Sequence, residues 1–157
     1  MKYAKDTTVT PARSLQEIKD TIGRYDGGSF LYFESATNVV IMFEMQKRRV
    51  RFVLPLPDKK DDEYKKILNA NSYSRRLGEF SPEKYQQAIR QRWRALVLTI
   101  KAKLESVESG IETFDEAFMA QVMLPDGQTV GEWMSPQIDA AYLTAKMPPM
   151  LPSGSKP

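Results

Sequence analysis

Residues 81–110 read SPEKYQQAIRQRWRALVLTIKAKLESVESG, and the rest of the chain is best interpreted around this run. It opens with Ser81-Pro82-Glu83, a cap followed by a first-turn proline and an acid, which is typical of a helix start. Apolar residues then recur every three or four positions, at Tyr85, Ile89, Trp93, Leu96, Ile100, Leu104 and Val107. This spacing predicts one helix over residues 81–109, about 40 Å long, with the apolar stripe buried. Gly110 follows at the position where helices usually end.

Three β-rich runs, residues 29–34, 39–45 and 48–54, precede this helix and are separated by short polar links. Short links between such runs predict an antiparallel meander. In the third run Val50, Phe52 and Leu54 alternate with Arg49 and Arg51, as expected when one face is buried and the other is solvated. The sequence therefore predicts an α+β fold in which a three-stranded antiparallel sheet packs on the one long helix.

Shorter helices are predicted at both ends of the chain. Ser14-Leu15-Gln16-Glu17 has the form of a capping box, and it would open a helix of about 11 residues. The apolar face of that helix consists of Leu15, Ile18, Ile22 and Tyr25. Further capping boxes begin at Thr113 and Thr129, and Ser135-Pro136 would restart a helix. These short C-terminal helices are expected to complete the core, with Phe114, Phe118 and Met119 available to pack and Ile138, Ala141 and Tyr142 inward.

The domain organisation follows from composition along the chain. Residues 10–147 are predicted to form one domain, because no linker divides them. Residues 58–79 are polar and weakly periodic, so we expect a mobile loop there, with at most a short helix. Residues 148–157 are rich in proline and are expected to be a disordered tail.

The composition narrows the possible chemistry. The 157 residues contain no Cys and no His, which excludes thiolate chemistry, serine triads and most zinc sites. No secretory signal or transmembrane run is present in the sequence, so we expect a cytoplasmic protein, in a host cell, without a membrane partner.

Two acidic groups were considered as metal sites. Glu34 and Glu44 lie on adjacent predicted strands, but at opposite ends of the hairpin, roughly 15–20 Å apart and too far to share an ion. The acids within residues 58–63 lack the spacing of a calcium loop, and they are better interpreted as solvated charges. With no glycine-rich phosphate loop either, the sequence predicts no catalytic site, no metal and no cofactor.

Charge is unevenly distributed along the chain. Residues 1–103 carry 21 of the 23 Lys and Arg residues and a net charge of +9, whereas residues 104–157 carry −6. The candidate nucleic-acid-binding residues are Lys47, Arg48, Arg49, Arg51, Arg90, Arg94 and Lys101. Arginine near aromatic residues suits phosphates and stacked bases. The alternatives are solvated faces, arginines paired with the acidic C-terminal half, and a protein partner. Trp93 and Trp133 are expected to be core or interface anchors.

The C-terminal region resembles small uncharacterised proteins of bacteriophage and prophage genomes. The resemblance rests on LPDGQTVGEW at residues 124–133, followed by Pro136-Gln137-Ile138, Ala141-Tyr142 and Met147-Pro148. The strand at residues 48–57 and the run Gln91-Arg92-Trp93-Arg94 are similar too. The resemblance implies a phage or mobile-element context and assigns no catalytic residues.

Two functions follow as expectations. The first is a non-enzymatic accessory protein that contacts DNA or RNA through its basic face, in phage replication, recombination or defence evasion. The second is a protein-binding module, or a homodimer, that inhibits or recruits a host or phage protein without binding nucleic acid.

Overall fold

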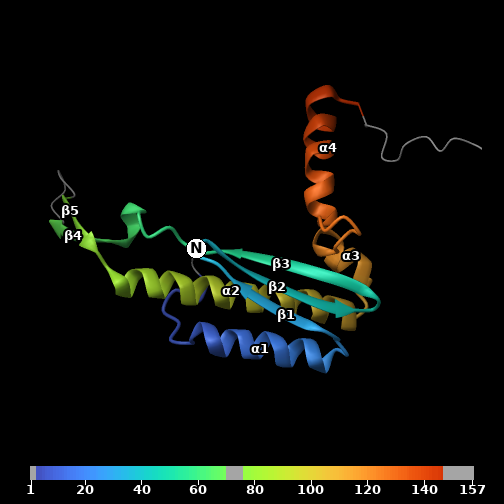
Figure 1. Ribbon diagram of the computed structural model, residues 1–157, viewed down its shortest axis with the longest axis horizontal. Coiled ribbons are helices and arrows are strands. Elements are labelled where there is room, and N and C mark those ends of the chain that lie inside the picture. The colour runs from blue at the N-terminus through green and yellow to red at the C-terminus, as the bar shows by residue number, and fades with distance from the viewer. Residues whose placement is uncertain (1–2, 70–75, 147–157) are drawn as a thin grey trace, which may run out of the picture.

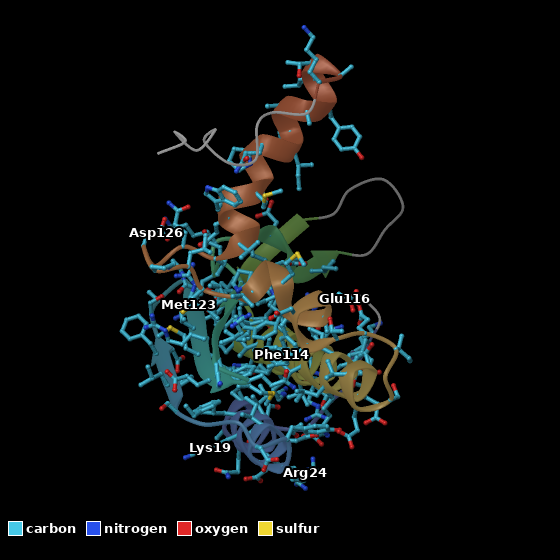
Figure 2. All side chains as sticks on the ribbon, turned by 90° about the vertical axis from the view of Figure 1, so that its right-hand side faces the viewer. Lys19, Arg24, Phe114, Glu116, Met123 and Asp126 are labelled. Carbon is cyan, nitrogen blue, oxygen red and sulfur yellow. The ribbon has the colours of Figure 1, made fainter. Side chains whose placement is uncertain are left out.

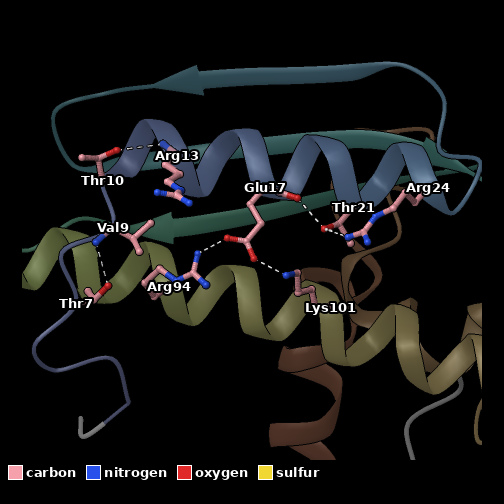
Figure 3. A network of polar contacts seen from close by, with 9 residues as sticks. All are labelled: Thr7, Val9, Thr10, Arg13, Glu17, Thr21, Arg24, Arg94 and Lys101. Atoms are coloured by element: carbon pink, nitrogen blue, oxygen red, sulfur yellow. Dashed lines mark hydrogen bonds and ion pairs between the residues drawn. The ribbon is translucent and has the colours of Figure 1, made fainter.

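The computed structural model describes residues 3–69 and 76–146. Its principal layer is a three-stranded antiparallel sheet in the order β1-β2-β3, with α1 and α2 side by side on one face (Figures 1 and 3). This arrangement confirms the predicted α+β class, the meander and the long helix. The elements run, in order, α1 (Pro11–Arg24), β1 (Phe30–Glu34), β2 (Asn38–Met45), β3 (Arg48–Pro55), η1 (Asp62–Tyr64), β4 (Lys65–Asn69), β5 (Arg76–Phe80), α2 (Pro82–Glu108), α3 (Phe114–Phe118), η2 (Met119–Gln121) and α4 (Val130–Thr144).

α2 follows the prediction closely. The Ser81 side chain caps the helix by accepting a hydrogen bond from the Lys84 N–H, Pro82 begins it, and Gly110 follows its end with φ +73°. A left-handed backbone at this position favours glycine because it has no Cβ. The stripe is buried as expected, except that Ile89 and Val107 are only partly buried at its margins.

The register of the sheet decides which side chains enter the core. Val39, Ile41 and Phe43 of β2 pair with Leu54, Phe52 and Val50 of β3, and all six point toward the helices and are buried. Burying a large aliphatic or aromatic side chain contributes about 1.5–3 kcal/mol, so this layer and the α2 stripe dominate the stability of the fold.

The start of α1 differs from the prediction. Thr10 caps the helix and Pro11 is its first residue, so α1 has 14 residues and begins a turn earlier than the capping box at Ser14 implied. Ser14 is therefore inside the helix and fully buried, because it lies four residues before Ile18 and eight before Ile22, on the same buried face of the helix. Ile18 and Ile22 are buried as predicted, with Leu15 and Tyr25 packed at the edge.

The segment predicted as a loop contains secondary structure. η1 leads into an antiparallel pair of β4 and β5. Tyr64 and Phe80 each approach the ring of Tyr85, with centroids 5.6 Å away, which ties this hairpin to the start of α2. Residues 70–75 and the predicted tail, residues 148–157, lie outside the described residues, and the mobility of both segments stays a prediction.

The two C-terminal helices behave differently. α3 joins the core as predicted, with Phe118 edge-on to Phe43 and Phe52 at centroid distances of 6.2 and 6.3 Å. Met119, which was also expected to pack, is instead 52% exposed. α4 does not join the core. The prediction that Ile138 and Tyr142 point inward is wrong, since their exposed fractions are 47% and 87%.

α4 instead projects from the rest of the molecule (Figure 1). It is one helix that continues through Pro136, without the predicted restart, because the capping box at Thr129 already provides its start. Among the helices in the described part of the chain, none is long and apolar enough to span a membrane.

Candidate functional site

The basic residues of β3 are largely engaged within the chain. The Arg48 guanidinium donates two hydrogen bonds of 3.2 Å to the Asp115 carboxylate at the start of α3. Arg51 forms an ion pair with Glu132 and donates to the Gly127 carbonyl at 3.0 Å. Arg51 was expected on a wet face, yet its side chain is only 20% exposed, since the start of α4 covers it. Both arginines therefore neutralise acids of the C-terminal half.

The basic flank of α2 is engaged as well. Arg94 and Lys101 both form ion pairs with Glu17 of α1, one at each carboxylate oxygen (Figure 3). Hydrogen bonds from Arg94 first and Lys101 second hold the pKa of Glu17 at about 2, against a partial opposing effect of burial. Arg90 donates to the Thr7 carbonyl at 3.3 Å and to the Gln87 side chain. No pattern in the sequence indicates Glu17 as the shared partner, because the contact spans α1 and α2.

Lys47 and Arg49 are the two candidates with no side-chain hydrogen bond or ion pair within residues 3–69 and 76–146. Both are exposed near the β2–β3 turn. Gln46 and Lys47 form that turn with φ +48° and +62°. Two left-handed residues are the requirement of a tight hairpin turn, so Lys47 is held at the tip of the hairpin. The seven candidates thus do not form one exposed basic surface.

The acidic groups do not assemble into a metal site. Glu34 lies opposite Val39 and Glu44 lies opposite Arg49, at the two ends of β2, as the hairpin geometry predicted. Within the described ranges, no three acidic side chains come close enough to hold a metal ion.

An uncovered apolar surface lies on the opposite side of the sheet from α1 and α2. We define the outer sheet face as Leu31, Phe33, Val40, Met42 and Val53. The strand register places Leu31 beside Met42, and Phe33 beside Val40 and then Val53. Leu31, Phe33 and Val53 are 59%, 61% and 49% exposed. Contiguous exposed apolar patches of this kind mark interaction sites more often than isolated exposed residues do.

The outer sheet face was missed at the sequence level, although a signal for it exists. Residues 30–33 read Phe-Leu-Tyr-Phe, an uninterrupted apolar run rather than an alternation. Such a run is typical of a strand whose two faces are both covered. In β1 the Tyr32 ring faces Trp93, with centroids 6.3 Å apart, while Leu31 and Phe33 face outward.

α4 is the second uncovered apolar element. None of its 15 residues, all of which the structure describes, is buried. Trp133, Ile138, Tyr142 and Leu143 are 39%, 47%, 87% and 87% exposed. Trp133 is therefore not a core residue, and the interpretation of it as an interface anchor stays open. Trp93, in contrast, is buried in the core as predicted.

The base of α4 is nevertheless fixed to the domain. Val122 and Met123 form a short antiparallel contact with β3, in which the Met123 N–H donates to the Arg49 carbonyl at 2.8 Å. At Gly131 an added Cβ would lie 2.8 Å from the Ala120 carbonyl oxygen, so only glycine allows this close approach. Figure 2 shows α4 leaving the domain above the region of Met123 and Asp126. The helix is held at one end and projects as a rod.

Hydrogen bonds also define the first turn of α4. Thr129 accepts from the Glu132 N–H at 3.2 Å, and Glu132 accepts from the Thr129 N–H at 2.8 Å. The backbone hydrogen bond from Thr129, and then the charge of Arg51, lower the pKa of Glu132. Glu132 thus remains ionised at neutral pH, as an ion pair with Arg51 requires.

Comparisons with family models, with curated proteins and with solved structures found no match to this chain.

Proposed function

We propose that this chain is a non-enzymatic protein-binding module that uses the outer sheet face and α4. Two observations support the choice over nucleic-acid contact. The uncovered surfaces are apolar, whereas four of the seven candidate basic residues are in ion pairs with Glu17, Asp115 or Glu132. Desolvated apolar and aromatic groups are the usual centre of a protein interface.

The main observation behind the proposal is that α4 has no buried residue. Isolated helices of about 12–15 residues are marginal in water, and a proline inside a helix costs about 3 kcal/mol or more. α4 has 15 residues, contains Pro136 and buries no side chain. Its capping box and its ion pair with Arg51 act only on the first turn. A partner that covers the rest of α4 would supply the missing stabilisation, and the exposed Trp133 and Tyr142 would be its anchors.

Nucleic-acid contact is the second candidate, and one observation favours it. Lys47 and Arg49 are exposed at the hairpin tip and make no side-chain ion pair within the described residues. Two phosphate contacts alone give weak binding, because affinity for nucleic acid grows with the number of neutralised phosphates.

The phage or mobile-element context, and with it a host cytoplasm, is proposed from the resemblance of the C-terminal region alone. In that context a module with an exposed apolar helix would inhibit or recruit another protein.

The test is affinity capture with matched variants. The tagged chain would be isolated from cells that express it, in parallel with Phe33→Glu, Tyr142→Glu and the control Ile111→Glu, where Ile111 is a 78% exposed apolar residue outside both surfaces. We expect the wild type and the control to retain the same protein, a second copy of the chain included, and the first two variants to lose it. The retained protein, once purified, should bind with an affinity that changes little between 50 and 500 mM salt.

Equal retention by all four proteins, or loss of the retained material on nuclease treatment, would overturn the proposal. Circular dichroism melts of the four proteins would show whether a variant loses binding only because it is unfolded.

A further inference from the structure

We infer that the partner is a second copy of this chain, in which each α4 lies across the outer sheet face of the other copy. The inference rests on the proposed function, and it explains both uncovered apolar surfaces by one contact. A helix packed on the apolar face of a sheet is the same kind of layer that α1 and α2 already form on the inner face.

The placement of α4 permits this exchange and prevents the equivalent contact within one chain. Arg51, Gly131 and the Val122–Val50 bridge fix the base of α4 beside β3. From there the helix runs across the direction of the strands and away from its own sheet (Figure 1). A two-fold axis parallel to the strands, next to β3, therefore brings each α4 over the other copy's sheet. Such a two-fold contact is closed and uses the same two patches twice.

The dimensions of the two surfaces agree. At about 1.5 Å per residue, α4 is about 22 Å long, and three strands about 4.8 Å apart are narrower than that. A helix that starts beside β3 thus crosses β2 and reaches β1, where Leu31 and Phe33 are the most exposed apolar residues of the sheet.

The buried area is sufficient for a dimer. Large aromatic side chains bury about 150–250 Å² each, and the exposed parts of Leu31, Phe33, Val53, Ile138 and Tyr142, the last two on one side of α4, together give roughly 500–650 Å² per copy. The sum for two copies is about 1,000–1,300 Å², at the lower end of the range of specific protein interfaces.

Charges do not oppose the contact. The outer sheet face is apolar at its centre, and its charged neighbours, Glu44, Arg49 and Arg51, are grouped toward the β2–β3 turn. Glu132 of α4 is already paired with Arg51. Asp139 is exposed and lies about 80° around the helix from the side of Ile138 and Tyr142, at the rim of the contact. The docking therefore requires no unpaired charge at the centre of the interface, which would be its most costly feature.

The experiment uses the absence of cysteine from the chain. Two single-cysteine proteins, Leu31→Cys and Ile138→Cys, with different mass tags, are mixed, allowed to exchange and treated with a short bis-maleimide. We expect a cross-linked product that contains both tags, together with a dimer mass in sedimentation velocity. Ile111→Cys in place of Ile138→Cys is the control and should give no such product. Phe33→Glu should convert the protein to a monomer that keeps its secondary structure, as far-ultraviolet circular dichroism would show, and that melts at a lower temperature than the dimer.

Each other outcome overturns the inference. A monomer at all concentrations excludes the dimer, but it leaves the proposed function intact if Phe33→Glu and Tyr142→Glu still abolish capture of a different protein. A product that joins two Leu31→Cys chains would show edge-to-edge pairing of β1 instead. A dimer that gives no mixed product with Ile138→Cys, or with Tyr142→Cys as a second position on the same side of α4, would show that another surface forms the interface.

Discussion

Arg51 and Glu132, 81 residues apart in the sequence, form an ion pair that joins the outward side of β3 to the first turn of α4. The same guanidinium holds the Gly127 carbonyl of the preceding turn. One arginine, predicted from alternation to face solvent, therefore positions the helix on which the proposed interface depends.

Replacing Arg51 with Met is predicted to loosen the base of α4 while keeping the apolar stem of the side chain. Glu132 is 52% exposed, so the global stability should fall by no more than about 1 kcal/mol. Amide hydrogen exchange at residues 130–134 should become faster. Arg49→Met, which removes a guanidinium with no ion pair in the described residues, is the control. Unchanged exchange in Arg51→Met would show that the ion pair does not hold the helix.

The stability of the fold is predicted to depend on pH through Glu17. Its pKa is about 2 in the folded chain and near 4.5 ordinarily, so the carboxylate contributes stability that is present above about pH 4.5 and is lost as the pH falls toward 2. Lys101 is 41% exposed and solvent screens its share, so we expect Glu17→Gln to cost about 1–2 kcal/mol at pH 6.

Urea unfolding of the wild type and Glu17→Gln at pH 6 and pH 2.5 measures this difference. The difference in unfolding free energy between the wild type and Glu17→Gln should become smaller at pH 2.5. The exposed Lys19→Gln variant, on the same helix, should have the same stability as the wild type at both pH values. An equal difference in unfolding free energy at both pH values would contradict the conclusion that the ionised Glu17 carboxylate stabilises the fold.

Thr10 and Ser14 allow a direct test of where α1 begins. Thr10 accepts a hydrogen bond from the Arg13 N–H at 3.2 Å, so Thr10→Ala should cost about 1 kcal/mol as a lost cap. The buried Ser14 hydroxyl has no hydrogen-bond partner among the described residues. Ser14→Ala should therefore be neutral or slightly stabilising, because it removes an unsatisfied polar group. Thermal melts measure both costs. If the helix began at Ser14, Ser14→Ala would lower the melting temperature more than Thr10→Ala.

Ile100 and Leu98 compare the two faces of α2. Ile100 is fully buried and Leu98 is 45% exposed. Ile100→Ala should cost about 2–5 kcal/mol through lost burial and the cavity that remains, and Leu98→Ala less than about 1 kcal/mol. Chemical denaturation of both variants measures the difference. Equal costs would mean that the stripe does not form the core.

DNA binding, if it occurs, is predicted to depend only weakly on salt. With Lys47 and Arg49 as the two of the seven candidates that make no side-chain hydrogen bond or ion pair in the described residues, the slope of log affinity against log salt should be no steeper than about −2, whereas seven contacting residues would give about −6. Fluorescence anisotropy with single-stranded and duplex DNA at several salt concentrations gives this slope. The double variant Lys47→Glu, Arg49→Glu should abolish DNA binding. A slope near −6 would instead show that all seven candidate residues contact phosphates.

The sequence by itself determined α2, the three-stranded meander, the buried stripe of α2 and the inward face of β3, because these depend on local periodicity, caps and strand alternation. Ser81, Gly110 and the stripe from Tyr85 to Leu104 needed no distant partner to be identified. The outer sheet face was also encoded locally, in the apolar run of residues 30–33, although alternation in β3 suggested a wet outer side.

Only the tertiary structure decided which charges are engaged and which apolar residues stay uncovered. Glu17 gathers Arg94 and Lys101 from another helix, and Arg51 meets Glu132, because packing brings together residues far apart in the sequence. Ile138 and Tyr142 have the spacing of a buried helix face, yet α4 has no neighbour within the described chain to cover them. Periodicity shows that a helix has an apolar side, whereas the direction in which that helix leaves the domain decides whether the side is buried.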